Sequence, residues 1–161
     1  MQEAVIILGG NQGDAPATFK RCEERFDELD YTLVNTSSIY SSPPWGFSSE
    51  NLFYNQVMVF ETNKIPQEVL NDCLSIENEL GRTRNNSPEY EDRLIDIDIL
   101  FYAEETLVEE HLTIPHPRLH ERKFCLVPLH EIMPDFIHPG LNKSIEKLLE
   151  ECADKSVISA V

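Results

Sequence analysis

A short segment at residues 93–101 (RLIDIDILF) combines alternating apolar residues with two aspartates, Asp96 and Asp98. Read as a β-strand, it places its isoleucines on one face and both aspartates on the other, because successive side chains alternate. Strands disfavour Asp, and neighbouring carboxylates on one face repel each other unless a positive charge lies between them. A divalent cation such as Mg²⁺ would bind both carboxylates and still accept substrate phosphates. The pattern indicates either a metal-binding strand or an exposed strand with acidic outward positions.

Arginines lie near this segment although the chain as a whole is strongly acidic. Thirteen Lys and Arg stand against 29 Asp and Glu, a formal net charge of −16 at pH 7. This charge argues against a broad basic surface for nucleic acid or anionic membranes. Arg82, Arg84 and Arg93 flank the aspartates, and guanidinium groups bind phosphate oxygens in a two-point geometry. These residues favour a phosphorylated small-molecule substrate; a solvated arginine cluster on an acidic surface is the alternative.

Length and composition are those of one globular domain, predicted to span residues 1–161, with 41% hydrophobic residues. No apolar run reaches membrane-spanning length, and the N-terminal residues lack a signal-peptide pattern. The four cysteines are widely separated, without a C-x-x-C motif, so we expect reduced thiols. The expected location is cytoplasmic.

The predicted elements follow the order strand, helix, two strands, helix, strand. An apolar run at 4–8 predicts the first strand, and a helix is expected to begin after Asp14. The other expected elements are strands at 33–42, 53–62 and 93–101, a helix at 66–80, one helical turn at 124–129 in an otherwise irregular segment 111–139, and a helix at 144–152. This order is typical of a ferredoxin-like α+β sandwich, with helices on one face of a mainly antiparallel sheet.

Seven motifs occur in one order: GGNQGD (9–14), SSIYSSPPWG (37–46), FYNQV (53–57), ENELGR (77–82), RLIDID (93–98), PHPR (115–118) and RKFCLVPL (122–129). Together they resemble the 6-hydroxymethyl-7,8-dihydropterin pyrophosphokinase family of folate biosynthesis, over about residues 4–140. The resemblance implies a three-layer, ferredoxin-like sandwich. It also implies transfer of pyrophosphate from ATP to the hydroxyl of 6-hydroxymethyl-7,8-dihydropterin, with release of AMP.

The resemblance assigns roles to individual residues. It implies two Mg²⁺ ions at Asp96 and Asp98, and catalytic roles for Arg82 and Arg93. The implied ATP-binding residues are Glu77, Arg84, Tyr90, Ile99, Leu112, Thr113, His116 and Arg122. The implied pterin-binding residues are Ser42, Pro43, Pro44, Trp45, Gly46, Phe53, Asn55 and Phe124. The ring is expected to stack between the two phenylalanines while Asn55 binds its amide edge. Glu77 is expected on the polar side of its helix.

The loop before the aspartate strand departs from the family pattern. It reads EYEDR at 89–93, one residue longer than the family loop, with Tyr90 where a tryptophan is usual and one arginine fewer. Its polarity and lack of apolar anchors predict that 83–92 forms a mobile lid over the substrates.

The implied partners are the two small-molecule substrates, with no nucleic acid and no membrane, and the expected state is a monomer. Two other functions compete: a metal-dependent phosphohydrolase using Asp96 and Asp98, and a binding module without chemistry. A hydrolase would need a water-activating base, which the sequence does not obviously supply. A binding module would not need the arginines and aspartates together. A P-loop kinase is excluded because the chain has no G-x-x-x-x-G-K-[ST] motif.

Overall fold

The computed structural model describes residues 1–43, 51–81 and 94–161. Strand β1 (Gln2–Gly10) lies inside the main sheet and pairs with β4 (Phe53–Thr62) on one side and β5 (Asp96–Tyr102) on the other. The sheet order is β5-β1-β4-β3-β8, where β3 is Tyr40–Ser42 and β8 is Ser159–Ala160, and β2 (Thr32–Thr36) also pairs with β4. Every strand pair among the described residues is antiparallel. The α+β class and the antiparallel sheet are therefore confirmed.

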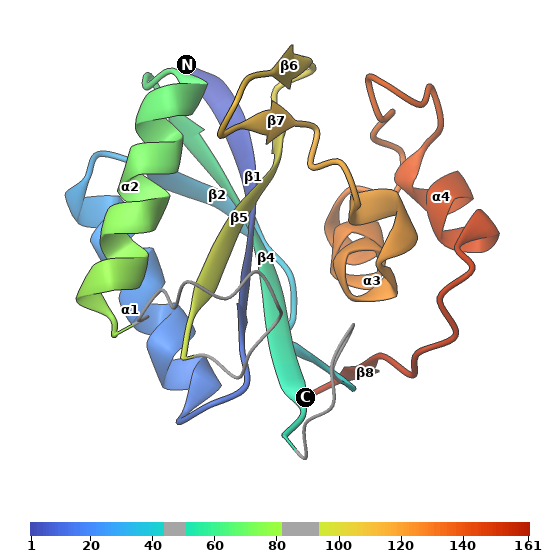
Figure 1. Ribbon diagram of the computed structural model, residues 1–161, viewed down its shortest axis with the longest axis horizontal. Coiled ribbons are helices and arrows are strands. Elements are labelled where there is room, and N and C mark those ends of the chain that lie inside the picture. Colours follow the sequence, from blue (N-terminus) through green and yellow to red (C-terminus); the bar gives the residue numbers. More distant parts are fainter. Residues whose placement is uncertain (44–50, 82–93) are drawn as a thin grey trace.

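Helices cover both faces of this sheet (Figure 1). Helices α1 (Ala15–Glu28) and α2 (Pro66–Glu79) pack on one face, and α3 (Lys123–Ile132) and α4 (Ile145–Glu151) pack on the other. The expectation from element order, helices on one face only, is wrong, and the three layers implied by the resemblance are present. The reason is β1, whose alternate side chains enter two separate cores, so both faces must be covered.

The ends of α1 and α2 agree with their sequence signals. Asp14 caps α1 by accepting a hydrogen bond from the Ala17 N–H at 3.2 Å. Pro66 begins α2, and Gly81 follows it with a φ of +98°, a conformation that glycine adopts without strain. No helix among the described residues is long and apolar enough to cross a membrane.

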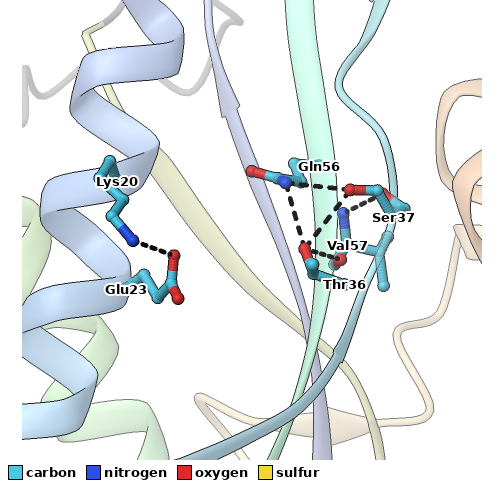
Figure 2. A network of polar contacts seen from close by, with 6 residues as sticks. All are labelled: Lys20, Glu23, Thr36, Ser37, Gln56 and Val57. Carbon is cyan, nitrogen blue, oxygen red and sulfur yellow. Dashed lines mark hydrogen bonds and ion pairs between the residues drawn. The ribbon is translucent and has the colours of Figure 1, made fainter.

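The strand expected at 33–42 is divided into β2 and β3. Between them, the Ser37 hydroxyl accepts a hydrogen bond from the Val57 N–H at 2.9 Å, while the Ser37 N–H donates to the Val57 carbonyl at 2.9 Å. Gln56 also donates to the Thr36 hydroxyl and the Ser37 carbonyl (Figure 2). A side chain therefore replaces part of the backbone ladder, and the prediction of one continuous strand is wrong.

The segment expected to be mostly irregular contains more structure than its prolines suggest. A hairpin of β6 (Leu107–Val108) and β7 (Thr113–Ile114) leads into it, and a 3₁₀ turn spans Leu119–Glu121. Helix α3 has 10 residues although it contains Pro128, because its apolar side chains pack into the second core. The single turn expected there is therefore too short, and β8 was not predicted.

Candidate active site

The aspartates of β5 lie on the face that the alternation predicted. Ile95, Ile97 and Ile99 are buried, whereas Asp96 and Asp98 are half-exposed. In the register with β1, Asp96 lies opposite Gly9 and Asp98 lies opposite Ile7. The two carboxylates therefore project from adjacent positions on the same side of one strand.

Glu77 is fully buried, with 1% of its surface exposed, so the expectation that it lies on the polar side of α2 is wrong. Its carboxylate accepts a hydrogen bond from the Ile97 N–H at 3.1 Å. Strand β5 is an edge of the sheet in the described part of the chain, so an N–H on its outer side needs a partner from elsewhere. Glu77 provides that partner and so fixes the backbone of β5 at Ile97, between Asp96 and Asp98.

A pocket of about 320 Å³ opens beside this strand. It brings together five of the residues expected to bind metal or ATP: Asp98, Ile99, Leu112, Thr113 and His116. The remaining lining residues are Leu70, Ile97, Glu110, His111 and Pro117, which the sequence did not single out as ligands. Glu110 and His111 belong to no recognisable sequence motif, and the β6–β7 hairpin brings them to the pocket. The pocket therefore brings Asp98 of β5 and His116 together at one site.

His116 is held in a defined protonation state. Burial, together with the Arg122 and Arg118 charges, lowers its pKa to about 4, and the Asp96 charge opposes this shift. Its Nδ1 accepts a hydrogen bond from the Arg118 N–H at 3.2 Å. The imidazole is therefore neutral at pH 7 with its proton on Nε2, where it can donate a hydrogen bond.

Arg122 connects the pocket with the start of α3. The residue is buried, and its guanidinium carbon lies 5.6 Å from the centre of the Phe124 ring. Its charge also lowers the pKa of His116. A residue expected to bind ATP thus contacts an aromatic residue expected to bind the pterin.

Asn55 and Ser42 form a second polar group on neighbouring strands. Asn55 is 6% exposed, and its side-chain N–H donates to the Leu8 carbonyl at 3.3 Å. It lies opposite Gly9, where a Cβ atom would come within 2.7 Å of the Asn55 amide nitrogen, so a side chain at position 9 would have to displace the Asn55 amide. The buried Ser42 hydroxyl has no hydrogen-bond partner among the described residues, and Ser42 pairs with the half-buried Phe53. Pro43 is exposed.

Several expected site residues lie outside the described residues. They are Pro44, Trp45, Gly46, Arg82, Arg84, Tyr90 and Arg93, together with the lid predicted at 83–92. Their roles stay predictions.

A family model described as 7,8-dihydro-6-hydroxymethylpterin-pyrophosphokinase (HPPK) matches residues 5–134. The chain belongs to this family. The 2-amino-4-hydroxy-6-hydroxymethyldihydropteridine pyrophosphokinase of Haemophilus influenzae is 36% identical over 159 residues, covering 98% of each protein. The protein of the same name from Aquifex aeolicus is 35% identical over 151 residues, covering 94% of this chain and 92% of the relative.

Longer proteins also contain a similar region. The folic acid synthesis protein fol1 of Pneumocystis carinii is 36% identical over 158 residues, and the chain spans 21% of its length. A solved HPPK-DHPS in complex with substrates aligns with a TM-score of 0.76 and 16% identity, covering 92% of this chain and 43% of the solved one. The wild-type HPPK-DHPS of Plasmodium falciparum aligns with a TM-score of 0.73 and 18% identity over 93% of this chain and 44% of its own. These structures support the HPPK fold.

Removing the Glu77 carboxylate should destabilise the protein. We expect Glu77→Ala to lower the free energy of unfolding by about 1–3 kcal/mol, because the buried Ile97 N–H loses its acceptor. Glu77→Gln keeps an acceptor oxygen and should lose less. Urea unfolding measures both, with exposed Asn78→Ala on the same helix as the control. Equal stabilities for Glu77→Ala and Asn78→Ala would contradict a role for this bond.

The stability of the protein should fall in acid through His116. The pKa of the His116 imidazole is about 6.5 in the unfolded chain and about 4 in the folded protein. The folded state therefore loses stability relative to the unfolded state as the pH falls from 6.5 toward 4. In metal-free protein, His116→Gln should reduce the stability difference between pH 7 and pH 4.5 by about 2 kcal/mol. Urea titrations at the two pH values measure it. The exposed His111→Gln should keep the wild-type difference, and a similar result for both variants would contradict the assignment.

Proposed function

We propose that this chain transfers pyrophosphate from ATP to the hydroxyl group of 6-hydroxymethyl-7,8-dihydropterin, a step of tetrahydrofolate synthesis. In this reaction the substrate oxygen forms a bond to the β-phosphorus of ATP, the bond from that phosphorus to the α–β bridging oxygen breaks, and AMP leaves. The hydroxyl proton is lost. Family membership over most of the chain supports this activity. The observation that carries it is the pocket in which Asp98, Ile99, Thr113 and His116 meet.

The aspartates fit a magnesium site. Magnesium is commonly bound by one or two carboxylates while substrate phosphates and water supply its other oxygens. Asp96 and Asp98 offer two half-exposed carboxylates on one strand face, Asp98 at the pocket, and the described residues contain no group of three or more His, Cys, Asp or Glu that could hold a metal by themselves, so substrate phosphates would supply further ligands. We propose that they hold two Mg²⁺ ions together with ATP. When bound, these ions would neutralise phosphate charge and orient the reacting oxygens.

The residues around the pocket would orient the nucleotide. The Nε2–H of His116 can donate to a phosphate oxygen without adding a charge, because the imidazole is neutral. Arg122 supplies a positive charge nearby, and Ile99, Leu112 and Thr113 supply the surface for the adenine and ribose. Charge neutralisation and positioning account for most catalysis of phosphoryl transfer. Arg82, Arg84, Tyr90 and Arg93 are proposed to complete this set.

The polar group on β3 and β4 would bind the pterin. Phe53 and Phe124 are both half-buried and would stack on the ring. The side-chain N–H of Asn55 that bonds the Leu8 carbonyl fixes the amide plane, so its remaining groups can read the ring edge. The Ser42 hydroxyl and the main chain of 42–46 would complete the contact. The monomeric state and the cytoplasmic location also stay predictions.

The product of the reaction tests the proposed function. With Mg²⁺, ATP and 6-hydroxymethyl-7,8-dihydropterin, we expect one AMP per pterin diphosphate, because the β-phosphorus is the one attacked. Chromatography separates the nucleotides, and omission of the pterin is the control. Release of ADP, or ATP breakdown at the same rate without pterin, would replace the proposal with a phosphohydrolase.

The aspartate pair should be needed for turnover but not for folding. We expect Asp96→Ala and Asp98→Ala each to lower kcat more than about a hundredfold, because metal-assisted charge stabilisation is lost. Without Mg²⁺ the melting temperature should be unchanged or slightly raised, since two like charges on one face no longer repel. Exposed Glu105→Ala, just beyond β5, is the control. Near-normal turnover of either variant at saturating Mg²⁺ would mean that the pair is only a solvated strand face.

A further inference from the structure

The last residues of the chain join the two elements that flank the proposed pterin site. After α4, residues 153–161 run along the α3 side of the sheet and end as β8 (Figure 1). Strand β8 pairs with β3, which ends at Ser42. The same residues contact the start of α3, where Phe124 lies. This segment lies beyond residue 134, where the match to the family model ends.

Asp154 holds the start of α3. One of its carboxylate oxygens accepts a hydrogen bond from the N–H of Lys123, the first residue of the helix, at 3.2 Å. The residue before the helix, Arg122, makes no side-chain cap among the described residues, so Asp154 takes that role from a distant part of the chain. A carboxylate at this position is also favoured by the helix dipole.

Asp154 is itself held in place. Its other oxygen accepts hydrogen bonds from the N–H of Ser156 at 2.9 Å and from the Ser156 hydroxyl at 2.5 Å. Partial burial opposes ionisation, but the hydrogen bonds from Ser156 and Lys123 keep the pKa of Asp154 below its usual range. The Asp154 carboxylate is therefore a fixed, negatively charged cap beside Lys123 and Phe124, the first two residues of α3.

Strand β8 holds β3 at the other end of the segment. Tyr40 pairs with Ala160 and Ser41 with Ser159, and the Val161 N–H donates to the Ile39 carbonyl at 2.9 Å. Without β8, β3 would be an edge strand of three residues, paired only with β4 in the described part of the sheet. Short edge strands shift easily, and a shift here would move Ser42.

A second connection joins α3 to the same strand. Glu131, near the end of α3, accepts hydrogen bonds from the Ser38 N–H at 3.0 Å and from the Tyr40 hydroxyl at 2.5 Å. The two ends of α3 are thus tied to the chain around β3, one by Glu131 and the other by Asp154 through β8. The distance between Phe124 and Ser42 depends on both ties.

We propose that Asp154 is a positioning residue for the pterin: by holding the start of α3 while β8 holds β3, it sets the place of Phe124 relative to Ser42 and Phe53. This inference rests on the proposed function, because it concerns the pterin side of that site. The residues that line the nucleotide pocket beside β5 come from other elements, and only Arg122, just before α3, is shared with it, so the larger effect should fall on the pterin.

Steady-state AMP formation by the full chain tests this inference. For Asp154→Ala we expect the KM for the pterin to rise about three- to tenfold, the size of a lost helix cap, with the KM for ATP changed less than about twofold. Asp154→Asn keeps an acceptor oxygen and should give a smaller rise. Lys155→Ala, an exposed neighbour, is the matched control and should behave as wild type.

Substitutions at β8 form an independent second test. Val161→Pro removes the N–H that bonds the Ile39 carbonyl, whereas Val161→Ala keeps it. Only the proline variant should raise the KM for the pterin, so the test holds even if Asp154→Ala fails to fold.

The outcomes are distinct. A pterin-specific rise in KM, partly restored by Asn, supports the inference. Equal changes in the KM for both substrates, or a lowered melting temperature with both KM values unchanged, would overturn it. If the wild-type chain forms no pterin-dependent AMP, the proposed function itself fails.

Discussion

The burial of β1 on both faces is the constraint from which the rest of the architecture follows. Ala4, Ile6 and Leu8 enter one core, and Val5 and Ile7 enter the other. Each fully buried aliphatic side chain is stabilised by about 1.5–3 kcal/mol relative to exposure, so neither face can remain in water. Helices must therefore pack on both sides. The polar site lies where these layers meet at β5 and the start of α3.

The two helical layers contribute differently to the site. From one side, α2 places Glu77 against the backbone of β5 and so supports the aspartates from within the core. From the other side, Arg122, just before α3, contacts Phe124 in its first turn, and the Arg122 charge acts on His116 of the pocket. The fold thus separates a supporting carboxylate, which is buried, from carboxylates that remain accessible to a ligand.

Elements whose limits depend on neighbouring residues could be predicted from the sequence. The limits of β4 and α2 follow from turn residues and apolar spacing, and the two faces of β5 follow from strict alternation. The family resemblance implied that Ile99, Thr113 and His116 all contact ATP, and the structure brings the three residues to one pocket.

Long-range contacts account for what the sequence did not reveal. Glu77 was expected on the polar side of α2 because it is charged, although it lies four residues after the buried Cys73 and three before Leu80, and its partner, the Ile97 N–H, comes from β5. The interruption between β2 and β3 depends on Ser37 meeting Val57, twenty residues away. The length of α3 depends on core packing that outweighs the presence of Pro128. In each case the deciding partner is distant in sequence, where propensity carries no information.

The hydrogen bond from Ile97 to Glu77 also affects how the protein behaves toward other copies of itself. An edge strand with unpaired N–H groups is a template on which another chain can add a strand and begin to aggregate. On β5 the Ile97 N–H already bonds a buried side chain, and Asp96 and Asp98 add like charges that a second copy would have to approach. These features disfavour sheet extension at the strand that carries the proposed metal ligands.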